Sequence, residues 1–245
     1  MNILAIGAHP DDIEILCAGS LALYARQGHN VVMASFTCGD MGDLKIAPQE
    51  LARIRRGESE AAAAVIGARL LWPGVMDEHV FPNEVQRRLM IDLIREADPD
   101  VIFTHSPDDY HPDHRYVSQL VFDSYFQKGL PHIPSQSRPA CRFGGTQIYY
   151  MDTIAGIGFY PTEYVDITSV IDTKRRMLRS HESQFSSISE LASRDIEQVM
   201  EIQARFRGLA GDCAFAEAFC RLESWQRGLS RRLLPYDRDP SQSGA

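Results

Sequence analysis

Short apolar segments alternate with longer amphipathic segments over the first half of the chain, and this alternation limits the possible folds more than any other feature. The apolar runs are continuous, as expected of buried strands, and do not alternate with polar residues. Four such strands are predicted, at residues 2–7, 31–37, 69–72 and 101–104. Strands of this kind are typical of a parallel sheet that helices cover on both faces.

Apolar positions at helical spacing predict the helices that separate and follow these strands. Gly28 and Gly67 stand where helix C-caps are expected. The predicted helices cover residues 13–28, 48–66, 85–97, 113–128, 169–181 and 189–208, and two later strands are predicted at 147–152 and 164–167. The whole pattern predicts an α/β fold, a Rossmann-like three-layer sandwich around a mostly parallel sheet.

The remaining segments complete the predicted organisation. Residues 129–145 are rich in Pro, Ser and Gly and are predicted to form a long surface loop. Residues 237–245 read DRDPSQSGA, a composition typical of a disordered tail. We therefore expect one domain over residues 1–236, with a C-terminal helical elaboration and a short disordered tail.

Composition and charge exclude several classes of function. The 245 residues are 44% hydrophobic and 24% charged, as in an ordinary globular protein. A net charge of −8 without any run of Lys or Arg argues against nucleic-acid binding. No apolar stretch approaches the about 18 residues of a membrane span, and the first residues lack the features of a signal peptide. Five scattered cysteines without a C-x-x-C pair favour reduced thiols and a cytoplasmic protein.

Two clusters of histidine and aspartate follow the first and fourth predicted strands. Residues 8–14 read AHPDDIE, and residues 105–114 read HSPDDYHPDH. Ligands of open α/β sheets bind at the carboxyl ends of the strands, where both clusters are placed. Helix capping accounts for one acid of the first cluster, but not for two adjacent aspartates after His-Pro. We therefore expect the clusters to meet at one metal ion with nitrogen and oxygen ligands.

The two clusters hold more carboxylates and imidazoles than a metal ion needs. A catalytic zinc site uses three protein ligands and keeps a position for water, whereas a structural site uses four. Additional acids and imidazoles beside an open metal suit hydrolysis, because one group takes a proton from water and another protonates the leaving atom. The clusters therefore predict a metal-dependent hydrolase.

The motif AHPDDIE, followed by HPDH at residues 111–114, resembles the PIG-L/LmbE family of zinc-dependent N-deacetylases. Members act on N-acetylglucosamine-type substrates. Residues 55–58 fit the family's R-x-x-E element, and Val165–Thr168 with Lys174 and residues 181–184 fit its VDIT…K…H-x-S-Q stretch. The resemblance covers most of the chain. Its first two motifs are specific, and the later elements are supportive.

The resemblance implies the metal ligands and the catalytic groups. It implies one zinc ion per chain, held by His9, Asp12 and His114. Asp11 would be the general base that activates water. His111 would stabilise the oxyanion or protonate the departing amine, and Asp113 would orient His111.

Three residues are predicted to contact the substrate. The resemblance implies that Arg55 holds hydroxyls or another polar group, although Arg53 and Arg56 stay open because helix phase decides which arginine faces the site. Tyr110 could donate to the oxyanion or pack on the neighbouring proline. Asp40 belongs to a Gly-rich loop after the second strand, which could line the same pocket or only form the turn.

Two histidines have alternative interpretations. His105 could support the metal site from behind or be an ordinary histidine. His181 lies in the H-x-S-Q element, and it could act in the site or be a satisfied buried residue.

The predicted function is zinc-dependent removal of an N-acyl group, with acetyl expected, from an amino sugar or its conjugate. The predicted partner is a small-molecule substrate, and a homo-oligomer is expected. One alternative is an amidase that uses the same zinc site on a non-sugar amide; another is a non-catalytic sugar-binding module. A two-metal phosphoesterase would need more bridging acids than the clusters offer. The chain has no Walker A loop, no H-E-x-x-H helix and no G-x-S-x-G elbow.

Overall fold

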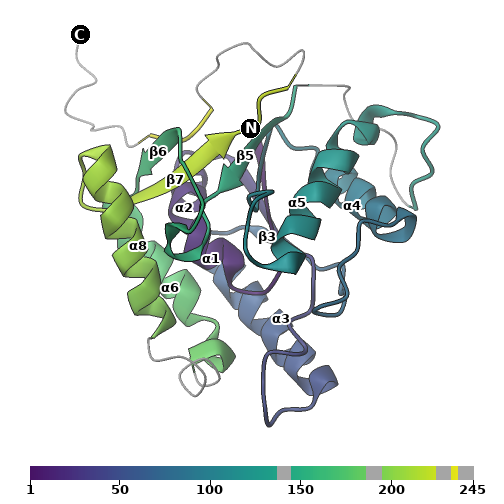
Figure 1. The fold of residues 1–245 in the computed structure, drawn as a ribbon, viewed down its shortest axis with the longest axis horizontal. Helices are drawn as coiled ribbons and strands as arrows, with labels where there is room; N and C mark the ends of the chain where they lie inside the picture. Colours follow the sequence, from purple (N-terminus) through teal and green to yellow (C-terminus); the bar gives the residue numbers. More distant parts are fainter. Residues whose placement is uncertain (137–144, 186–194, 225–232, 237–245) are drawn as a thin grey trace.

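The computed structural model describes residues 1–136, 145–185, 195–224 and 233–236. Within these residues, seven strands form one sheet in the order β3-β2-β1-β4-β5-β7-β6 (Figure 1). The strands are β1 (Asn2–Gly7), β2 (Asn30–Ser35), β3 (Arg69–Leu71), β4 (Val101–Thr104), β5 (Gln147–Met151), β6 (Glu163–Asp166) and β7 (Ala216–Arg221). The α-helices are α1 (Asp12–Leu16), α2 (Ala18–Arg26), α3 (Pro48–Val65), α4 (Glu84–Ala97), α5 (Pro112–Tyr125), α6 (Ile171–Arg179) and α8 (Ile196–Gly211), and the short 3-10 helices are η1 (Gln127–Gly129), η2 (Ile154–Gly156) and η3 (Thr168–Val170).

The first five strands run parallel to one another, as the sequence predicts. β1 pairs with β2 on one side and with β4 on the other. The chain runs outward from β1 to β2 and β3, and it later runs in the opposite direction from β4 to β5. The carboxyl ends of β1 and β4 therefore flank the topological switch point of the sheet, where open α/β folds bind ligands.

The other end of the sheet is antiparallel. β7 lies between β5 and β6 and is antiparallel to both. This strand is not among the predicted ones, because its six residues, AEAFCR, contain a buried glutamate and lack a continuous apolar run. Its pairing partners come from much earlier in the chain, so local pattern alone does not reveal it.

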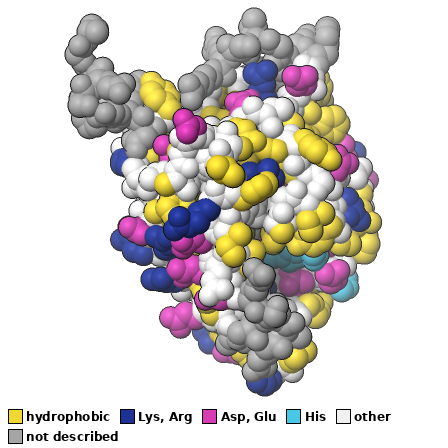
Figure 2. Space-filling view, turned by 60° about the vertical axis from the view of Figure 1, so that its left-hand side comes forward, with side chains coloured by type: hydrophobic (Ala, Val, Ile, Leu, Met, Phe, Trp, Pro, Cys, Tyr) yellow, Lys and Arg dark blue, Asp and Glu magenta, His cyan; other side chains and the backbone are white. Residues whose placement is uncertain are grey.

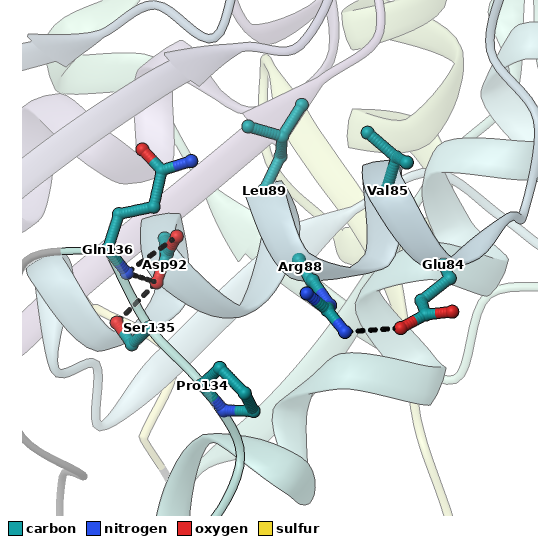
Figure 3. Close-up of a pocket in the computed structure, with 8 residues that line it drawn as sticks. All are labelled: Glu84, Val85, Arg88, Leu89, Asp92, Pro134, Ser135 and Gln136. Atoms are coloured by element: carbon teal, nitrogen blue, oxygen red, sulfur yellow. Dashed lines mark hydrogen bonds and ion pairs between the residues drawn. The ribbon is translucent and has the colours of Figure 1, made fainter.

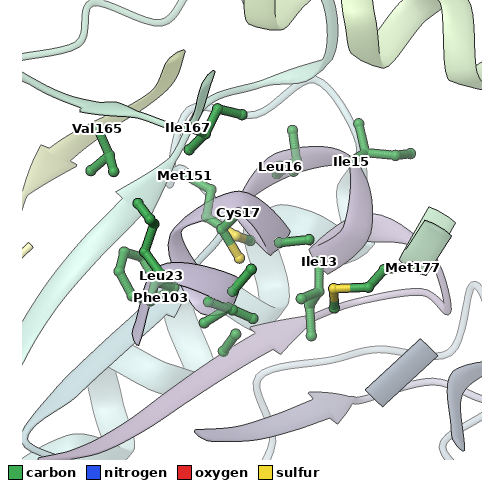
Figure 4. Packing of buried hydrophobic residues seen from close by; sticks show 14 of the residues in the cluster. Ile13, Ile15, Leu16, Cys17, Leu23, Phe103, Met151, Val165, Ile167 and Met177 are labelled. Carbon is green, nitrogen blue, oxygen red and sulfur yellow. The ribbon is translucent and has the colours of Figure 1, made fainter. Parts of the chain in front are cut away.

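Helices cover both faces of the sheet and form three layers, which confirms the predicted fold class. One apolar core lies under α4 and α5 and includes Ile6, Phe36, Ile94 and Leu120. The second and larger core lies under α1, α2, α6 and α8. Figure 4 shows part of it, where residues of the first helices pack close to side chains from the sheet and from α6: Ile13, Cys17, Phe103, Met151 and Met177.

The structure divides the predicted helix 13–28 into α1 and α2. The break lies at Cys17, whose backbone is not helical. The carboxylate of Glu217 accepts hydrogen bonds from the backbone N–H groups of Gly19 (2.8 Å) and Ser20 (2.7 Å) at the start of α2. An acid from the last strand thus satisfies the N-terminus of a new helix, a contact that the local sequence does not show.

Most other boundaries agree with the predictions within a few residues. Residues 137–144 of the predicted loop, 189–194 of the predicted last helix and the predicted tail at 237–245 lie outside the described residues. Among the described residues, no helix has both the length and the apolar character needed to cross a membrane.

Candidate functional site

A cavity of about 340 Å³ opens at the carboxyl ends of β1 and β4, on the switch point. Both predicted clusters line it, together with α3, the loop after β3 and residues from the C-terminal third of the chain. The lining residues are His9, Asp11, Asp12, Ile15, Met41, Gly42, Arg55, Asp77, Glu78, Tyr110, His111, His114, Ile154, Gln184 and Ile196. The fold thus brings together the two histidine-aspartate clusters that are far apart in sequence.

Asp12 lies between the two histidines predicted to share a metal ion with it. Its Oδ1 is 3.3 Å from Nε2 of His114, and its Oδ2 is 3.5 Å from Nδ1 of His9. The two imidazole rings are 5.3 Å apart between centroids, and the ring of His111 lies within 4.8 Å of each. The structure therefore places the three predicted ligands in one group, with a third imidazole beside them.

A second carboxylate faces the outer nitrogen of each of these histidines. Oδ2 of Asp113 is 3.3 Å from Nε2 of His9, and Oδ2 of Asp109 is 3.1 Å from Nδ1 of His114. This carboxylate–imidazole arrangement fixes the ring orientation of metal-binding histidines in other proteins. The inner nitrogen of each ring is left to face Asp12.

The charges of the cluster favour a cation. Burial opposes protonation of His114, but the carboxylates of Asp12 and Asp109 outweigh this effect and raise its pKa to about 9. The same two carboxylates that hold this proton on His114 also attract a divalent ion, which would take the place of the proton. Imidazole nitrogens and a carboxylate oxygen are ligands that suit zinc. Close nitrogen atoms of His9, His111 and His114 form one of three groups in this region able to hold a metal.

Asp11 has a backbone conformation that residues other than glycine rarely adopt. Its φ is 111°, it precedes α1, and its side chain makes no capping hydrogen bond. Such strain persists where surrounding structure enforces it, and it is concentrated at functional sites. Burial, reinforced by the adjacent charge of Asp12, raises the pKa of Asp11 to about 7, against the opposing influence of Arg55 and His181. This carboxylate can therefore gain and lose a proton near neutral pH.

His111 caps the N-terminus of α5. Its Nδ1 accepts a hydrogen bond from the backbone N–H of Asp113 at 3.2 Å. Burial and the neighbouring histidines lower its pKa, so the ring is neutral at pH 7. A neutral ring whose Nδ1 accepts carries its proton on Nε2, which lies 3.7 Å from Oε1 of Glu78. His111 thus offers an N–H donor at the cavity.

Asp113, which is predicted to orient His111, contacts its ring through the backbone. Its backbone N–H, rather than its carboxylate, holds the His111 ring. Its carboxylate oxygen Oδ2 faces His9 and also accepts a hydrogen bond from the backbone N–H of Glu78 at 2.9 Å. Because this oxygen already has two partners, Asp113 orients His9 through its side chain and His111 through its backbone.

The structure shows which of the three arginines of α3 faces the cavity. Arg55 lines it and is 3% exposed, whereas Arg53 and Arg56 lie on the solvent side, paired with glutamates of the same helix. The Arg55 side chain runs beneath the loop after β2. A Cβ atom added to Gly39, which has a φ of 67°, would lie 2.4 Å from Cδ of Arg55, so this position requires glycine.

The two other predicted substrate contacts lie in different places. Tyr110 lines the cavity and is 51% exposed at its rim. Asp40 is buried and is not among the lining residues. Its Oδ1 accepts a hydrogen bond from the backbone N–H of Asp77 at 2.9 Å, and the carboxylate of Asp77 accepts one from Gly39 at 2.8 Å. Asp40 therefore holds two loops of the cavity wall together.

The two histidines with alternative interpretations are fully buried. His105 stacks on His114 with a centroid distance of 3.9 Å, and its Nε2 lies 2.9 Å from the backbone nitrogen of Ala8. It therefore supports the cluster from behind. His181 lies 3.4 Å from Glu14 and does not line the cavity.

Several lining residues are absent from the predicted site. Glu58 of the R-x-x-E element accepts hydrogen bonds from the backbone and hydroxyl of Ser183, both at 2.7 Å, and this contact carries the adjacent Gln184 to the cavity. Gln184 is part of the H-x-S-Q element, so the sequence pattern could have identified it as a site residue. Local sequence gave no comparable signal for Ile154, Ile196 or Glu78, which reach the cavity only through the tertiary fold.

A larger cavity of about 520 Å³ lies elsewhere, between α4 and residues 134–136 (Figure 3). It contains no histidine. Its charged side chains are already paired, Arg88 with Glu84, and Asp92 with the hydroxyl of Ser135 and the backbone of Gln136. Size alone therefore does not identify the candidate site, whereas the imidazoles and carboxylates gathered at the smaller cavity do.

The parallel sheet and the clustered imidazoles and carboxylates define an α/β protein with a histidine–aspartate site able to hold a metal ion. The family model PIG-L, described as GlcNAc-PI de-N-acetylase, matches residues 4–125. A diacetylchitobiose deacetylase of Thermococcus kodakarensis is 30% identical over 195 residues, covering 75% of this chain and 70% of the relative. The chain belongs to the PIG-L family.

Other similarities agree with this assignment. A 1D-myo-inositol 2-acetamido-2-deoxy-alpha-D-glucopyranoside deacetylase of Rhodococcus jostii is 27% identical, covering 86% of this chain and 93% of the relative. The solved structure of an N,N'-diacetylchitobiose deacetylase from Pyrococcus horikoshii is 26% identical, with a TM-score of 0.77, covering 90% of this chain and 83% of that one. Its family and these relatives identify the chain as an enzyme.

The fold also occurs in a protein named for a different reaction. The 4-carboxy-2-hydroxymuconate hydratase GalB of Pseudomonas putida has a TM-score of 0.78 but is 19% identical, over 94% of this chain and all of that one. This similarity shows the shared fold alone. The function must therefore be argued from the site.

Proposed function

We propose that the protein is a zinc-dependent hydrolase that removes an N-acyl group, with acetyl expected, from an amino sugar or its conjugate. The observation that carries this proposal is the meeting of His9, Asp12 and His114 with Asp11 and His111 in one cavity. The relatives named above support the same reaction class, since they are named as deacetylases of N-acetylated sugars.

The donor set fits a zinc ion, with His9, Asp12 and His114 as its proposed ligands. A zinc ion bound there would lower the pKa of water and polarise the carbonyl group of the amide. Asp109 and Asp113 would hold the two ligand histidines in orientation, each from the outer side of its ring.

The chain's own groups would carry out the proton transfers. Asp11 takes a proton from the water that attacks the carbonyl carbon, and its raised pKa suits a base that later gives up this proton. The Nε2–H of His111 donates to the carbonyl oxygen as negative charge develops there. The amine nitrogen must gain a proton as the C–N bond breaks, and the proton held by Asp11 meets that need. The first products are a carboxylic acid and a free amine, and proton exchange between them gives a carboxylate and an ammonium group.

Two lining groups are suited to bind the polar part of the substrate. The buried Arg55 has no hydrogen-bond partner for its Nε, and the buried Gln184 has none for its Nε2. A buried donor that has no acceptor lowers the stability of the fold, unless a ligand supplies the acceptor. Hydroxyl or carbonyl oxygens of a sugar conjugate would do so.

The test is release of primary amine from a panel of N-acetylated amino sugars and their conjugates by zinc-loaded protein. Asp11→Asn should abolish release while leaving the zinc content unchanged. Asp172→Asn, the same substitution at an exposed position of α6, should release amine at the wild-type rate. If no panel member releases amine although zinc is bound, the deacetylase assignment is wrong.

Three further parts of the proposal concern the domain, the location and the assembly of the protein. We infer that residues 1–236 act as one domain, since strands drawn from residues 2–221 share one sheet. A cytoplasmic location is supported by the free thiols of the described cysteines, Cys17, Cys38, Cys213 and Cys220. Assembly into a homo-oligomer is supported by exposed apolar side chains on α8, such as Ile202, Phe206 and Leu209. Light scattering would measure the mass in solution, and a monomer would contradict the last inference.

A further inference from the structure

One wall of the cavity is apolar and comes from three separate elements. Ile15 of α1, Ile154 of η2 and Ile196 of α8 all line the cavity that contains the histidines. Ile15 and Ile196 are buried, and Ile154 is half-buried against the larger core. The elements touch one another, since α8 contacts both α1 and η2. Three isoleucines from neighbouring elements therefore lie at this part of the cavity.

The segment that carries Ile154 is held firmly on α8. The side chain of Gln203 donates to the carbonyl of Thr153 and accepts from the backbone N–H of Ala155, both at 2.9 Å. One turn later, the buried Arg207 makes two hydrogen bonds to the carboxylate of Asp152, at 2.6 and 2.9 Å. These contacts fix both sides of Ile154. A wall fixed in this way can select among substrates, because its position does not adapt to each one.

The same segment has an unusual backbone. Ala155 has a φ of 61°, a left-handed conformation that costs energy in a residue other than glycine. Gly156 follows with a φ of 68°, and a Cβ atom there would lie 2.7 Å from the Arg207 guanidinium. The turn that presents Ile154 to the cavity is therefore both strained and tightly enforced. Strain of this kind is found where the position of a functional side chain matters.

Apolar side chains continue outside the cavity on the same two segments. Ile157 and Tyr160, after η2, are 61% and 86% exposed, and Ile202 and Phe206 of α8 are 52% and 58% exposed. In Figure 2, the small part of the histidine surface that is visible, at the lower right of the view, has hydrophobic side chains next to it. Further apolar surface therefore lies on the segment after η2 and on the exposed face of α8.

We propose that the substrate carries an apolar substituent of more than two carbons, and that Ile15, Ile154 and Ile196 form the subsite that binds it. This inference rests on the proposed amide hydrolysis. A substrate with hydroxyls on every side would have to bury some of them against isoleucine, where they find no hydrogen-bond partner. An alkyl or aryl group would instead lose only its contact with water, which is favourable. The polar part of the substrate would face Arg55 and Gln184.

The apolar substituent has two possible places in an amide, the acyl side and the amine side. The experiment therefore has two arms. The first compares N-acetyl-, N-butyryl- and N-hexanoylglucosamine, and the second compares methyl and hexyl glycosides of N-acetylglucosamine. The proposal predicts that kcat/KM rises about fourfold for each methylene that the wall buries, in one arm and not in the other.

Ile154→Asn should abolish the rise in kcat/KM with chain length. Ile154→Val, a smaller change that disturbs folding less, should reduce that rise. Val85→Asn, at a 70% exposed position of α4, should keep the full rise. If N-acetylglucosamine is hydrolysed but neither arm shows a rise, the apolar subsite is wrong and the proposed hydrolysis stands.

A binding measurement keeps the two proposals separable. If no amide is hydrolysed, the proposed function is wrong. Calorimetry with the same compounds then measures their affinities and tests the apolar subsite independently of hydrolysis. Tighter binding of the hexanoyl or hexyl compound, lost in Ile154→Asn, would support the subsite. Equal affinity for the short and long compounds would overturn it.

Discussion

Two parts of the sheet contribute different things to the same cavity. Residues 1–125 carry β1 to β4 and are called the parallel half; residues 145–221 carry β5 to β7 and are called the antiparallel half, although β5 still pairs in parallel with β4. The parallel half supplies the metal-binding histidines and carboxylates from the ends of β1 and β4. The antiparallel half supplies mainly apolar surface, through Ile154 and Ile196, with Gln184 as its polar contribution. The family model matches residues 4–125, nearly the same span as the parallel half.

This contrast indicates that the two halves have different roles in one cavity, catalysis in the parallel half and substrate choice mainly in the antiparallel half. Proposed ligands and proton carriers require fixed geometry, and the switch point of a parallel sheet provides it. The choice of substrate depends on walls that can vary without disturbing that geometry. The comparison predicts that substitutions in one half change the chemistry and that substitutions in the other change stability or substrate choice.

The largest effect is expected for Arg207→Ala in the antiparallel half. The change leaves the buried carboxylate of Asp152 without its partner, which costs about 3–5 kcal/mol of unfolding free energy. Arg205→Ala, on the same helix but 59% exposed, should cost about 1 kcal/mol or less. Urea unfolding measures both. Zinc bound per folded chain should be unchanged in each variant, and loss of zinc in Arg207→Ala would contradict the proposed difference in roles.

The next effect is expected for His111→Ala in the parallel half. Loss of the proposed oxyanion donor should lower kcat about 10²–10³-fold. The zinc content should stay at the wild-type level, because His111 is not among the proposed ligands. His132→Ala, at an exposed position, serves as the control. A variant of His111 that binds no zinc would show that this residue is itself a ligand.

A smaller effect is expected for the carboxylates behind the ligand histidines. Asp113→Asn and Asp109→Asn should each weaken zinc binding about 10–100-fold, because each removes the charge that orients a ring. Competition with a chelator measures the affinity. Activity should largely return when zinc is in excess. Asp108→Asn, on the same loop but exposed, should bind zinc as the wild type does.

The sequence predicts the parallel half far better than the antiparallel half, for physical reasons. β1 and β4 are continuous apolar runs, and each is followed at once by its cluster, so a local pattern carries both fold and site. β7 is different: its glutamate, Glu217, is buried because it binds Lys174 and the start of α2. Only the tertiary structure provides those partners.

The same reasoning applies to individual site residues. The motifs predict that His9, Asp12 and His114 meet, and the structure brings them together. The sequence cannot decide whether Arg53, Arg55 or Arg56 faces the site, because that depends on the rotation of α3 against the sheet. It also cannot show Ile154, whose place depends on contacts with Gln203 and Arg207 of a helix much later in the chain.

The smallest effects are expected for alanine substitutions at two glycines of the parallel half, Gly42 and Gly57. A Cβ atom at Gly42 would lie 2.8 Å from an Nη atom of Arg55, at the end of a flexible side chain. Gly42→Ala should therefore displace the guanidinium and raise KM severalfold, with little change in stability. Gly57 lies in the exposed middle of α3, where an added Cβ meets nothing within 4 Å. Gly57→Ala should raise the unfolding free energy by about 0.5–1 kcal/mol and leave KM unchanged.

Steady-state kinetics measures KM of both glycine variants, and urea unfolding measures their unfolding free energy. If Gly42→Ala leaves KM unchanged, the Arg55 guanidinium does not contact the substrate. The parallel half would then supply the chemistry and, of the groups proposed to select the substrate, only Ile15 of the apolar subsite. The remaining groups, Ile154, Ile196 and Gln184, belong to the antiparallel half. If KM rises as expected, Arg55 of the parallel half binds the polar part of the substrate. The antiparallel half then selects mainly the apolar part of the substrate.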